Sequence, residues 1–238
     1  MANAYPQRGF TLPPDARELI LARHGASQAA LPDQPFALLD GHADPPLAPE
    51  GVGQAQRLAE RLEAEAPAAL FVTPLQRTWQ TAEPLAGRTG LEPLVIPELR
   101  EVMLGDWEGG EFRIRVANGD PLVARLFDEE RWDVIPGAEP RDAFAARVRE
   151  GLEHALERIP DGGTGVAVLH GGVIAEICHQ VTGSRPFAFI QVDNTSITRL
   201  VRFANGRWLL RLFNDTAHLT GAFGAPSGEP TPRAARTP

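Results

Sequence analysis

The chain has 238 residues, a formal net charge of −8 at pH 7, and 43% hydrophobic and 23% charged residues. This length suits one α/β domain with a full core, and the composition is that of a folded protein without membrane-spanning segments. The negative charge and the lack of a run of basic residues exclude nucleic acid and membranes as expected partners. All 23 basic residues are arginine, so lysine Schiff bases and P-loop lysines are also excluded.

The predicted elements begin after a segment that is rich in proline and glycine. Residues 1–17 offer few apolar groups to bury, so we expect a flexible N-terminal tail, and residues 219–238 predict a flexible C-terminal tail for the same reason. No apolar segment follows a basic start at the N-terminus, so we expect a cytoplasmic protein. Residues 18–218 are expected to form the single domain.

Between the tails, short apolar runs alternate with helical patterns. The predicted strands are residues 18–22, 68–72, 93–96, 164–170 and 195–203, and the predicted helices are 51–65, 75–88, 142–158 and 172–182. This alternation predicts a three-layer α/β/α fold with a mainly parallel central sheet, whose ligands bind beyond the carboxyl ends of the strands. The stretch from about 105 to 141 breaks the alternation, so we expect a partly helical insertion that covers the site. An apolar stripe on an edge strand would favour a homodimer.

Two predicted strands end in nearly the same way. "LILARHG" (19–25) and "VAVLHGG" (166–172) carry His24 and His170 to the carboxyl edge of the sheet, and a glycine follows each histidine. Glycine lets the backbone turn tightly, and a helix that begins near Gly172 would direct free N–H groups at an anion. A single histidine at a strand end is more often a structural hydrogen-bonding group than a catalytic one.

The stretch "TPLQRTWQTA" (73–82) follows another predicted strand and has the pattern of a helix start. We expect Thr73 as the N-cap and Gln76 as its capping-box partner. Arg77 then lies near the positive end of the helix dipole, which favours a bound anion beside it. A solvated surface arginine is the alternative interpretation.

Glu101 lies in "LREVMLGDWEG" (99–109), between a predicted strand and the insertion. A carboxyl group that is partly covered by apolar side chains is a candidate general acid. The alternative is an ordinary surface glutamate among the 31 acidic residues of the chain.

A metal-dependent interpretation rests on "DGHAD" (40–44), which has the D-x-H-x-D spacing of metal-dependent hydrolases. No second cluster of histidine and aspartate completes a metal shell. We therefore expect no metal, and we expect His42 at the rim of the substrate entrance.

Taken together and in order, these motifs resemble the histidine phosphatase superfamily, in the branch that includes cofactor-dependent phosphoglycerate mutases. The resemblance covers about residues 18–216 and includes "DPPLAPEG" (44–51) and "VDNTSITRL" (192–200). It implies a phosphoglycerate mutase-like fold, no cofactor, and a small phosphorylated substrate.

The resemblance also implies a role for each site residue. His24 is the nucleophile that forms a phosphohistidine, and Arg23, Arg77 and His170 surround the phosphoryl group. Glu101 protonates the leaving alcohol and then activates water. The possible substrate contacts are Ser27, Gln28 and Gly171. The stretch "RHGASQAA" departs from the family, because Ala26 and Ala30 stand where many members have glutamate and asparagine.

The sequence is consistent with three functions. The first is a metal-independent phosphomonoesterase of histidine acid phosphatase type, and the second is a phosphoglycerate mutase. The insertion has arginines but no lysine, and it lacks a run of paired arginines followed by prolines, which favours hydrolysis. The third is an inactive phosphate-ligand sensor, which would have no use for the acid Glu101.

Overall fold

The computed structural model describes residues 5–220. The first four residues of the expected N-terminal tail (1–4) and nearly all of the expected C-terminal tail (221–238) lie outside the described residues. Within the described part, β1 begins at Arg17, and the last helix, α7 (Ala217–Thr220), extends past residue 218. Regular structure therefore begins one residue before the expected start of the domain and ends two residues after its expected end.

The central sheet has six strands in the order β5-β4-β6-β1-β7-β8. Their bounds are β1 Arg17–Arg23, β4 Ala69–Val72, β5 Leu94–Val95, β6 Thr164–Leu169, β7 Ile197–Arg202 and β8 Trp208–Asp215. The pairs β4–β5, β4–β6 and β1–β6 are parallel, whereas β7 runs antiparallel to both β1 and β8. The prediction of a mainly parallel sheet is confirmed, and β8 is a strand that the sequence analysis missed.

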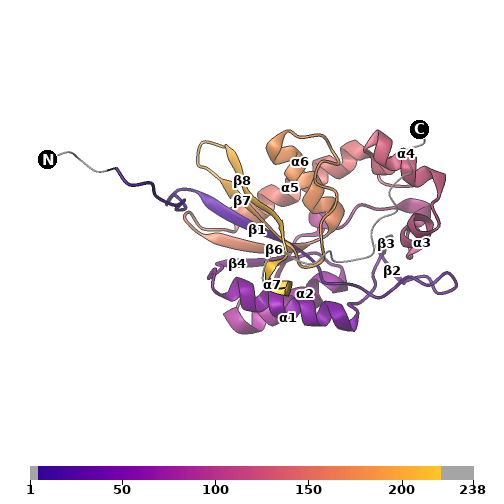
Figure 1. Cartoon of the computed structure of the whole chain (residues 1–238), viewed down its shortest axis with the longest axis horizontal. Coiled ribbons are helices and arrows are strands. Elements are labelled where there is room, and N and C mark those ends of the chain that lie inside the picture. The colour runs from indigo at the N-terminus through magenta and orange to yellow at the C-terminus, as the bar shows by residue number, and fades with distance from the viewer. Residues whose placement is uncertain (1–4, 221–238) are drawn as a thin grey trace.

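Helices cover both faces of the sheet. The helices α1 (Pro49–Glu63) and α2 (Gln76–Thr89) lie on one face, and α5 (Arg141–Glu157) and α6 (Gly171–Thr182) lie on the other (Figure 1). Successive residues of β1 point to opposite faces, so Ile20 packs in the core beneath α1 and α2, whereas Leu19 packs in the core beneath α5 and α6. A strand buried on both faces explains the continuous apolar run "LILA", and the predicted three-layer fold is confirmed.

The start of α2 differs from the sequence prediction. The helix begins at Gln76, Leu75 is its N-cap, and no side chain of the N-cap residue makes a capping hydrogen bond. Instead, the Gln76 N–H donates to Oδ1 of Asp44 over 2.8 Å. Thr73 is therefore not the N-cap, because a carboxylate from a distant loop caps the helix. The Thr73 hydroxyl accepts from the Leu75 N–H over 3.3 Å and makes a further contact described below.

The insertion lies at one end of the sheet, beside the hairpin of β2 (Leu38–Leu39) and β3 (His42–Ala43) (Figure 1). It contains α3 (Glu111–Ala117), α4 (Pro121–Glu129) and two 3₁₀ turns, η2 (Gly105–Trp107) and η3 (Trp132–Val134). Its two ends meet backbone to backbone, since a Cβ on Gly105, which has φ +54°, would lie 2.2 Å from the carbonyl carbon of Gly137. The predicted partly helical insertion is confirmed.

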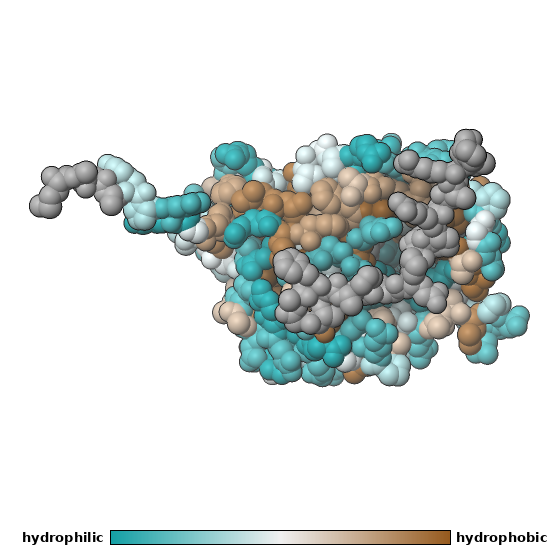
Figure 2. Space-filling view, viewed as in Figure 1, coloured by the Kyte–Doolittle hydropathy of each residue, from teal (hydrophilic) through white to brown (hydrophobic). Residues whose placement is uncertain are grey.

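The surface over α1 and α2 is mainly hydrophilic on the face drawn in Figure 2, and hydrophobic residues gather above it, toward the edge formed by β7 and β8. Leu209 of β8 is one of the exposed apolar side chains on this edge strand. Within residues 5–220, no helix is both long and apolar enough to cross a bilayer. A homodimer through such an edge remains a prediction.

Candidate active site

The parallel pairing of β1 and β6 brings His24 and His170 together. Arg23 pairs with Leu169 in the sheet, and the His24 N–H continues the ladder by donating to the Leu169 carbonyl over 2.9 Å. The two imidazole rings lie 5.3 Å apart, edge to face. The Asn194 side chain donates to the His24 carbonyl over 2.9 Å and fixes the end of the strand. Both predicted histidines therefore occupy one buried site.

The hydrogen bonds of His24 define its tautomer. Nδ1 lies 2.8 Å from the Gly25 carbonyl, which only accepts, so Nδ1 carries the proton and Nε2 keeps its lone pair. Nε of Arg77 donates to that lone pair over 3.3 Å. Burial, followed by the charges of Arg77 and Arg23, lowers the pKa of His24 well below its usual value. The ring is therefore neutral at neutral pH, as a nitrogen nucleophile requires.

His170 has one satisfied and one unsatisfied ring nitrogen. Its Nε2 lies 3.0 Å from the hydroxyl of Thr73, which is the contact that replaces the expected capping role of that residue. Its Nδ1 is buried without a hydrogen-bond partner in the described part of the chain. Burial, and then the charge of Arg77, lowers the pKa of His170. An unpaired buried nitrogen costs free energy unless a ligand satisfies it.

Two predicted arginines complete the floor of the site. Arg23 donates to the Val192 carbonyl, while its Nε is buried and unpaired within the described residues. Arg77 donates from Nη1 to the Ala43 carbonyl over 2.8 Å. Burial lowers the pKa of Arg77 to about 10, so it remains charged at neutral pH. The guanidinium groups and the unpaired nitrogens together suit an oxyanion ligand.

A third arginine that lines the cavity is Arg113 of α3, which no motif distinguishes from the other arginines of the insertion in the sequence. Its Nη2 donates to Ser27 Oγ over 2.7 Å, and its Nη1 donates to the Gln28 carbonyl over 2.8 Å. Removal from water, and then the charge of Arg23, lowers the pKa of Arg113. Ser27, Gln28 and Gly171 themselves do not line the cavity, so their role as substrate contacts stays a prediction.

Glu101 lines the same cavity and is held against the start of α6. The Gly172 N–H donates to Oε2 over 3.2 Å, and the Val102 N–H donates to Oε1 over 3.0 Å. A Cβ at position 172 would lie 2.5 Å from Oε1. Residue 172 must therefore be glycine for Glu101 to keep this position beside the histidines.

Arg147 of α5 supports the backbone that carries Glu101. It donates to the carbonyl oxygens of Glu98, Arg100 and Glu101 at 2.7, 2.7 and 2.9 Å. Its guanidinium also forms two 2.7 Å hydrogen bonds with the Glu139 carboxylate. Sequence reasoning missed this residue because an isolated arginine in a helix carries no motif.

The sequence also indicated no role for Glu108, although this residue lies in the same stretch, 99–109, as Glu101. Its two carboxylate oxygens accept hydrogen bonds from the Ala43 N–H at 2.7 Å and the Leu104 N–H at 2.8 Å. The side chain therefore joins strand β3 to the insertion and places a fixed negative charge on the cavity wall.

The cavity between these groups has a volume of about 250 Å³. Its polar side is the floor of arginines and histidine described above, together with His42 and the two glutamates. Its apolar wall is formed by Phe36, Val102, Leu104, Trp107, Phe112 and Trp132. One side of the cavity thus suits an anion, and the other suits an apolar group.

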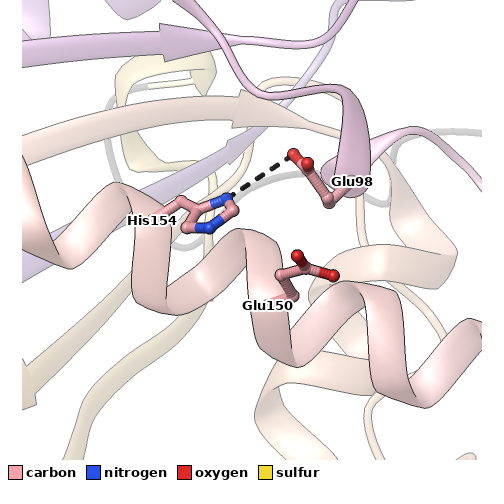
Figure 3. Close-up of side chains that lie close together, drawn as sticks. All are labelled: Glu98, Glu150 and His154. Atoms are coloured by element: carbon pink, nitrogen blue, oxygen red, sulfur yellow. Dashed lines mark ion pairs between the residues drawn. The ribbon is translucent and has the colours of Figure 1, made fainter.

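The D-x-H-x-D motif at residues 40–44 does not form a cluster of metal ligands. Asp40 pairs with Arg100 at 3.0 Å and Asp44 caps α2, while His42 lines the cavity and directs Nδ1 at the Asp40 carbonyl. Within residues 5–220, the one group with metal-ligand spacing is Glu98, Glu150 and His154. These side chains lie on η1 (Pro97–Leu99) and α5 (Figure 3), outside the cavity, and the latter two are exposed.

Comparisons with known proteins agree with this geometry. The model of the histidine phosphatase superfamily (branch 1) matches residues 19–216. Phosphoglycerate mutase-like protein 4 of Arabidopsis thaliana is 33% identical over 214 residues, which cover 86% of this chain and 88% of that protein. Glucosyl-3-phosphoglycerate phosphatase of Mycobacterium tuberculosis is 33% identical over 170 residues, which cover 68% of this chain and 74% of that protein.

A comparison with a solved structure supports the same family. The native structure of the mycobacterial glucosyl-3-phosphoglycerate phosphatase superposes with a TM-score of 0.69 at 29% identity, and the match covers 84% of this chain and 100% of that chain. The motif order, the fold and the paired histidines therefore have one common explanation: the chain belongs to the histidine phosphatase superfamily.

Proposed function

We propose that the protein is a metal-independent phosphomonoesterase that acts through a phosphohistidine on a small phosphorylated metabolite. The observation that carries the proposal is the unprotonated Nε2 of the neutral His24 ring. It lies in a cavity that is lined by arginines and also by Glu101. The similarity to a named phosphatase supports hydrolysis as the reaction.

In the first step, Nε2 of His24 attacks phosphorus and the bond from phosphorus to the ester oxygen breaks. Arg23 and Arg77 line the cavity and stabilise the charge on the equatorial oxygens. His170 lies behind the cavity lining, 5.3 Å from the His24 ring, and in this proposal its Nδ1, which has no partner within residues 5–220, is a further contact for the phosphoryl group. Glu101 gives its proton to the leaving alcohol oxygen. The products of this step are the free alcohol, the phosphohistidine and the Glu101 carboxylate.

In the second step, the Glu101 carboxylate takes a proton from water, and the resulting hydroxide attacks phosphorus. The bond from phosphorus to Nε2 breaks, inorganic phosphate forms, and the electron pair returns to His24. Both residues end in their starting protonation states, so one acid and one nucleophile suffice for the complete cycle.

The charges around the cavity support catalysis without a metal. Arg23, Arg77 and Arg113 all line it, and their positive charges repel a divalent cation while they neutralise a phosphoryl group. Activity in excess EDTA is the direct consequence.

The insertion supports hydrolysis over mutase chemistry. A mutase must hold a second anionic group of its substrate, which requires further cations at the cavity. Among the arginines of the insertion, only Arg113 lines the cavity. Three others form ion pairs within the insertion: Arg115 with Glu111 and Asp120, Arg125 with Glu129, and Arg131 with Glu129 and Asp133.

The test combines turnover with trapping of the intermediate. We expect the purified protein to hydrolyse p-nitrophenyl phosphate in excess EDTA, and acid-labile, alkali-stable phosphate to appear on the protein after a rapid quench. His24→Asn should abolish both signals, whereas His154→Ala, which changes a half-exposed histidine outside the cavity, should retain both. Full turnover by the His24→Asn protein would overturn the proposal.

The same preparation separates the alternatives. Interconversion of 2- and 3-phosphoglycerate that depends on 2,3-bisphosphoglycerate would identify a mutase. Phosphate binding without turnover of any ester would identify a sensor.

A further inference from the structure

We propose that the substrate is a phosphate monoester whose alcohol part carries an aromatic or similarly apolar group and no second anion. This inference rests on the proposed phosphatase function and assigns the apolar wall of the cavity to the leaving group.

Glu101 marks the place of the leaving oxygen, because the acid must reach that atom to protonate it. Trp132 lies beside the same place. The Cβ position of residue 172 is 2.5 Å from Oε1 of Glu101 and 3.5 Å from Cζ2 of Trp132. Any group bonded to the leaving oxygen must therefore begin next to the indole ring.

The wall continues from Trp132 as a series of aromatic rings. The ring centres of Trp132 and Phe112 are 5.9 Å apart, and those of Phe112 and Trp107 are 6.1 Å apart. Trp107 packs in the small core of the insertion and is almost fully buried, so it fixes the position of the wall. Rings at these spacings favour an aromatic partner that lies edge to face or offset against them.

The charges on this side of the cavity disfavour a second anion on the substrate. Both oxygens of Glu108 are held by backbone amides, so its negative charge cannot turn away from the wall. His42 directs Nδ1 at a carbonyl oxygen, so its Nε2, which has no partner among the described residues, is a hydrogen-bond acceptor in the neutral ring. A carboxylate beside these groups would meet repulsion and would gain no donor from them.

Arg113 belongs to the phosphoryl side of the cavity. It is bonded to Ser27 Oγ and the Gln28 carbonyl, both in the loop that follows His24, and it lies over the ring of Phe36 at 5.8 Å. Its charge acts on His24, where it helps to lower the pKa of the imidazole. It therefore adds to the phosphate site and does not provide a separate site for a carboxylate.

The size of the cavity sets the size of the leaving group. A volume of about 250 Å³ lies just below the range of roughly 300–1,000 Å³ that is common for small-molecule sites. A phosphoryl group and a single ring suit this space better than a disaccharide or a nucleotide.

The experiment compares three alkyl phosphates: 2-phenylethyl phosphate, ethyl phosphate and 3-phosphoglycerate. The first two release alcohols of similar acidity, so their difference in kcat/KM reports on the apolar group alone. We expect 2-phenylethyl phosphate to exceed ethyl phosphate by about tenfold or more, since one well-fitting apolar group contributes at least that factor. We expect 3-phosphoglycerate to fall below ethyl phosphate.

Two tryptophan variants test the wall itself. Trp132→Leu should reduce the ratio of kcat/KM for 2-phenylethyl phosphate to kcat/KM for ethyl phosphate at least threefold. A change of this order is expected from the loss of one aromatic contact. Trp79→Leu is the matched control, because Trp79 lies on α2, is 40% exposed and does not line the cavity. This control should keep the ratio of the parent protein. If Trp132→Leu does not fold, Phe112→Leu provides the same test.

The outcomes separate the two proposals. If no phosphate ester is hydrolysed, the phosphatase function is wrong. If esters are hydrolysed but ethyl phosphate or 3-phosphoglycerate equals 2-phenylethyl phosphate, the phosphatase function stands and the inference on the substrate is overturned. An unchanged ratio in the variants of the wall would also overturn it.

Discussion

The guanidinium of Arg77 donates a hydrogen bond from Nε to Nε2 of His24 over 3.3 Å. This contact lies on the lone pair that the proposed mechanism directs at phosphorus. Nη1 of the same guanidinium is anchored on the Ala43 carbonyl, so the group cannot follow a phosphoryl group freely. Arg77 therefore orients the nucleophile and also stands beside the place where an incoming phosphoryl oxygen would lie.

The first prediction concerns the variant Arg77→Met. We expect kcat/KM for p-nitrophenyl phosphate to fall about 10²- to 10³-fold, the usual order for the loss of one preorganised charge at the reacting group. The measurement is steady-state kinetics, with circular dichroism as the check on folding. A loss below threefold in the folded variant would contradict the role of Arg77 in the site.

The second prediction concerns the dependence on pH. Protonated His24 cannot attack phosphorus, and burial with the charges of Arg77 and Arg23 lowers its pKa. Activity that depends on neutral His24 should therefore persist below pH 6.5, the ordinary value for a histidine. In Arg77→Met one cause of the shift is absent, so the pKa of His24 should rise. Titration of the His24 imidazole by NMR in both proteins checks this, and an unchanged value in the variant would contradict it.

The third prediction concerns leaving groups. A poor leaving group needs the proton of Glu101, whereas p-nitrophenolate leaves with little help. Glu101→Gln should therefore lose about 10²- to 10³-fold in kcat for an alkyl phosphate, and much less in the rate of phosphohistidine formation from p-nitrophenyl phosphate. Equal losses for the two esters in rapid-quench kinetics would exclude Glu101 as the acid.

Two glycine variants test the same acid without changing its side chain. Gly172→Ala would place a Cβ 2.5 Å from Oε1 of Glu101 and displace the carboxylate. Gly171→Ala would place a Cβ 3.6 Å from Arg23 Nε, an ordinary van der Waals contact. We expect Gly172→Ala to lower kcat more for alkyl phosphates than for p-nitrophenyl phosphate. We expect Gly171→Ala to lower kcat for alkyl phosphates far less.

The fourth prediction concerns the support of the Glu101 loop by Arg147. Arg147→Met removes the hydrogen bonds that Arg147 donates to the carbonyls of Glu98, Arg100 and Glu101, and it leaves the Glu139 carboxylate without its arginine. We expect a loss of about 2 kcal/mol in the free energy of unfolding, measured by urea denaturation. We also expect kcat to fall more for alkyl phosphates than for p-nitrophenyl phosphate.

A double variant provides the control for this prediction. Arg147→Met with Glu139→Leu removes both partners of the ion pair, so it should recover part of the stability. It should recover no activity toward alkyl phosphates, because the carbonyls near Glu101 still lack their donor. Full recovery of activity would mean that Arg147 does not position Glu101.

The sequence was sufficient to predict the parts of the site that follow strand ends. His24 and His170 could be placed together because parallel strands share a carboxyl edge, and both are marked by the same histidine and glycine pair. The structure confirms that they meet at 5.3 Å. Arg77 was placed correctly although the reason was partly wrong, since Asp44 and not Thr73 caps the helix that carries it.

The parts that were missed depend on contacts between distant segments. Arg147 and Glu108 bind backbone groups that are far from them in the sequence. Arg147 lies 46 positions from Glu101, and Glu108 lies 65 positions from Ala43. No local pattern distinguishes such residues from the surface arginines and glutamates around them. Only the folded insertion defines which of them face a carbonyl or an amide.

Strand β8 was missed despite a local signal. "ANGR" (204–207) separates two apolar runs, and the pair Asn205 and Gly206 is typical of a tight hairpin turn. In the structure, the Phe203 N–H donates to the Arg207 carbonyl across this turn over 2.9 Å. This dipeptide between two apolar runs predicts the second strand of the hairpin.

The cavity draws its two sides from separate stretches of chain. The end of β1 and the first turn of α2 supply His24 and Arg77, whereas the insertion supplies Phe112 and Trp132. Substitutions of the aromatic side chains in the insertion can therefore reshape the apolar wall without replacing His24 or Arg77. A graft of a relative's insertion onto this sheet would therefore exchange most of the aromatic wall while His24 and Arg77 stay in place, and so would separate selectivity from the rest of the site.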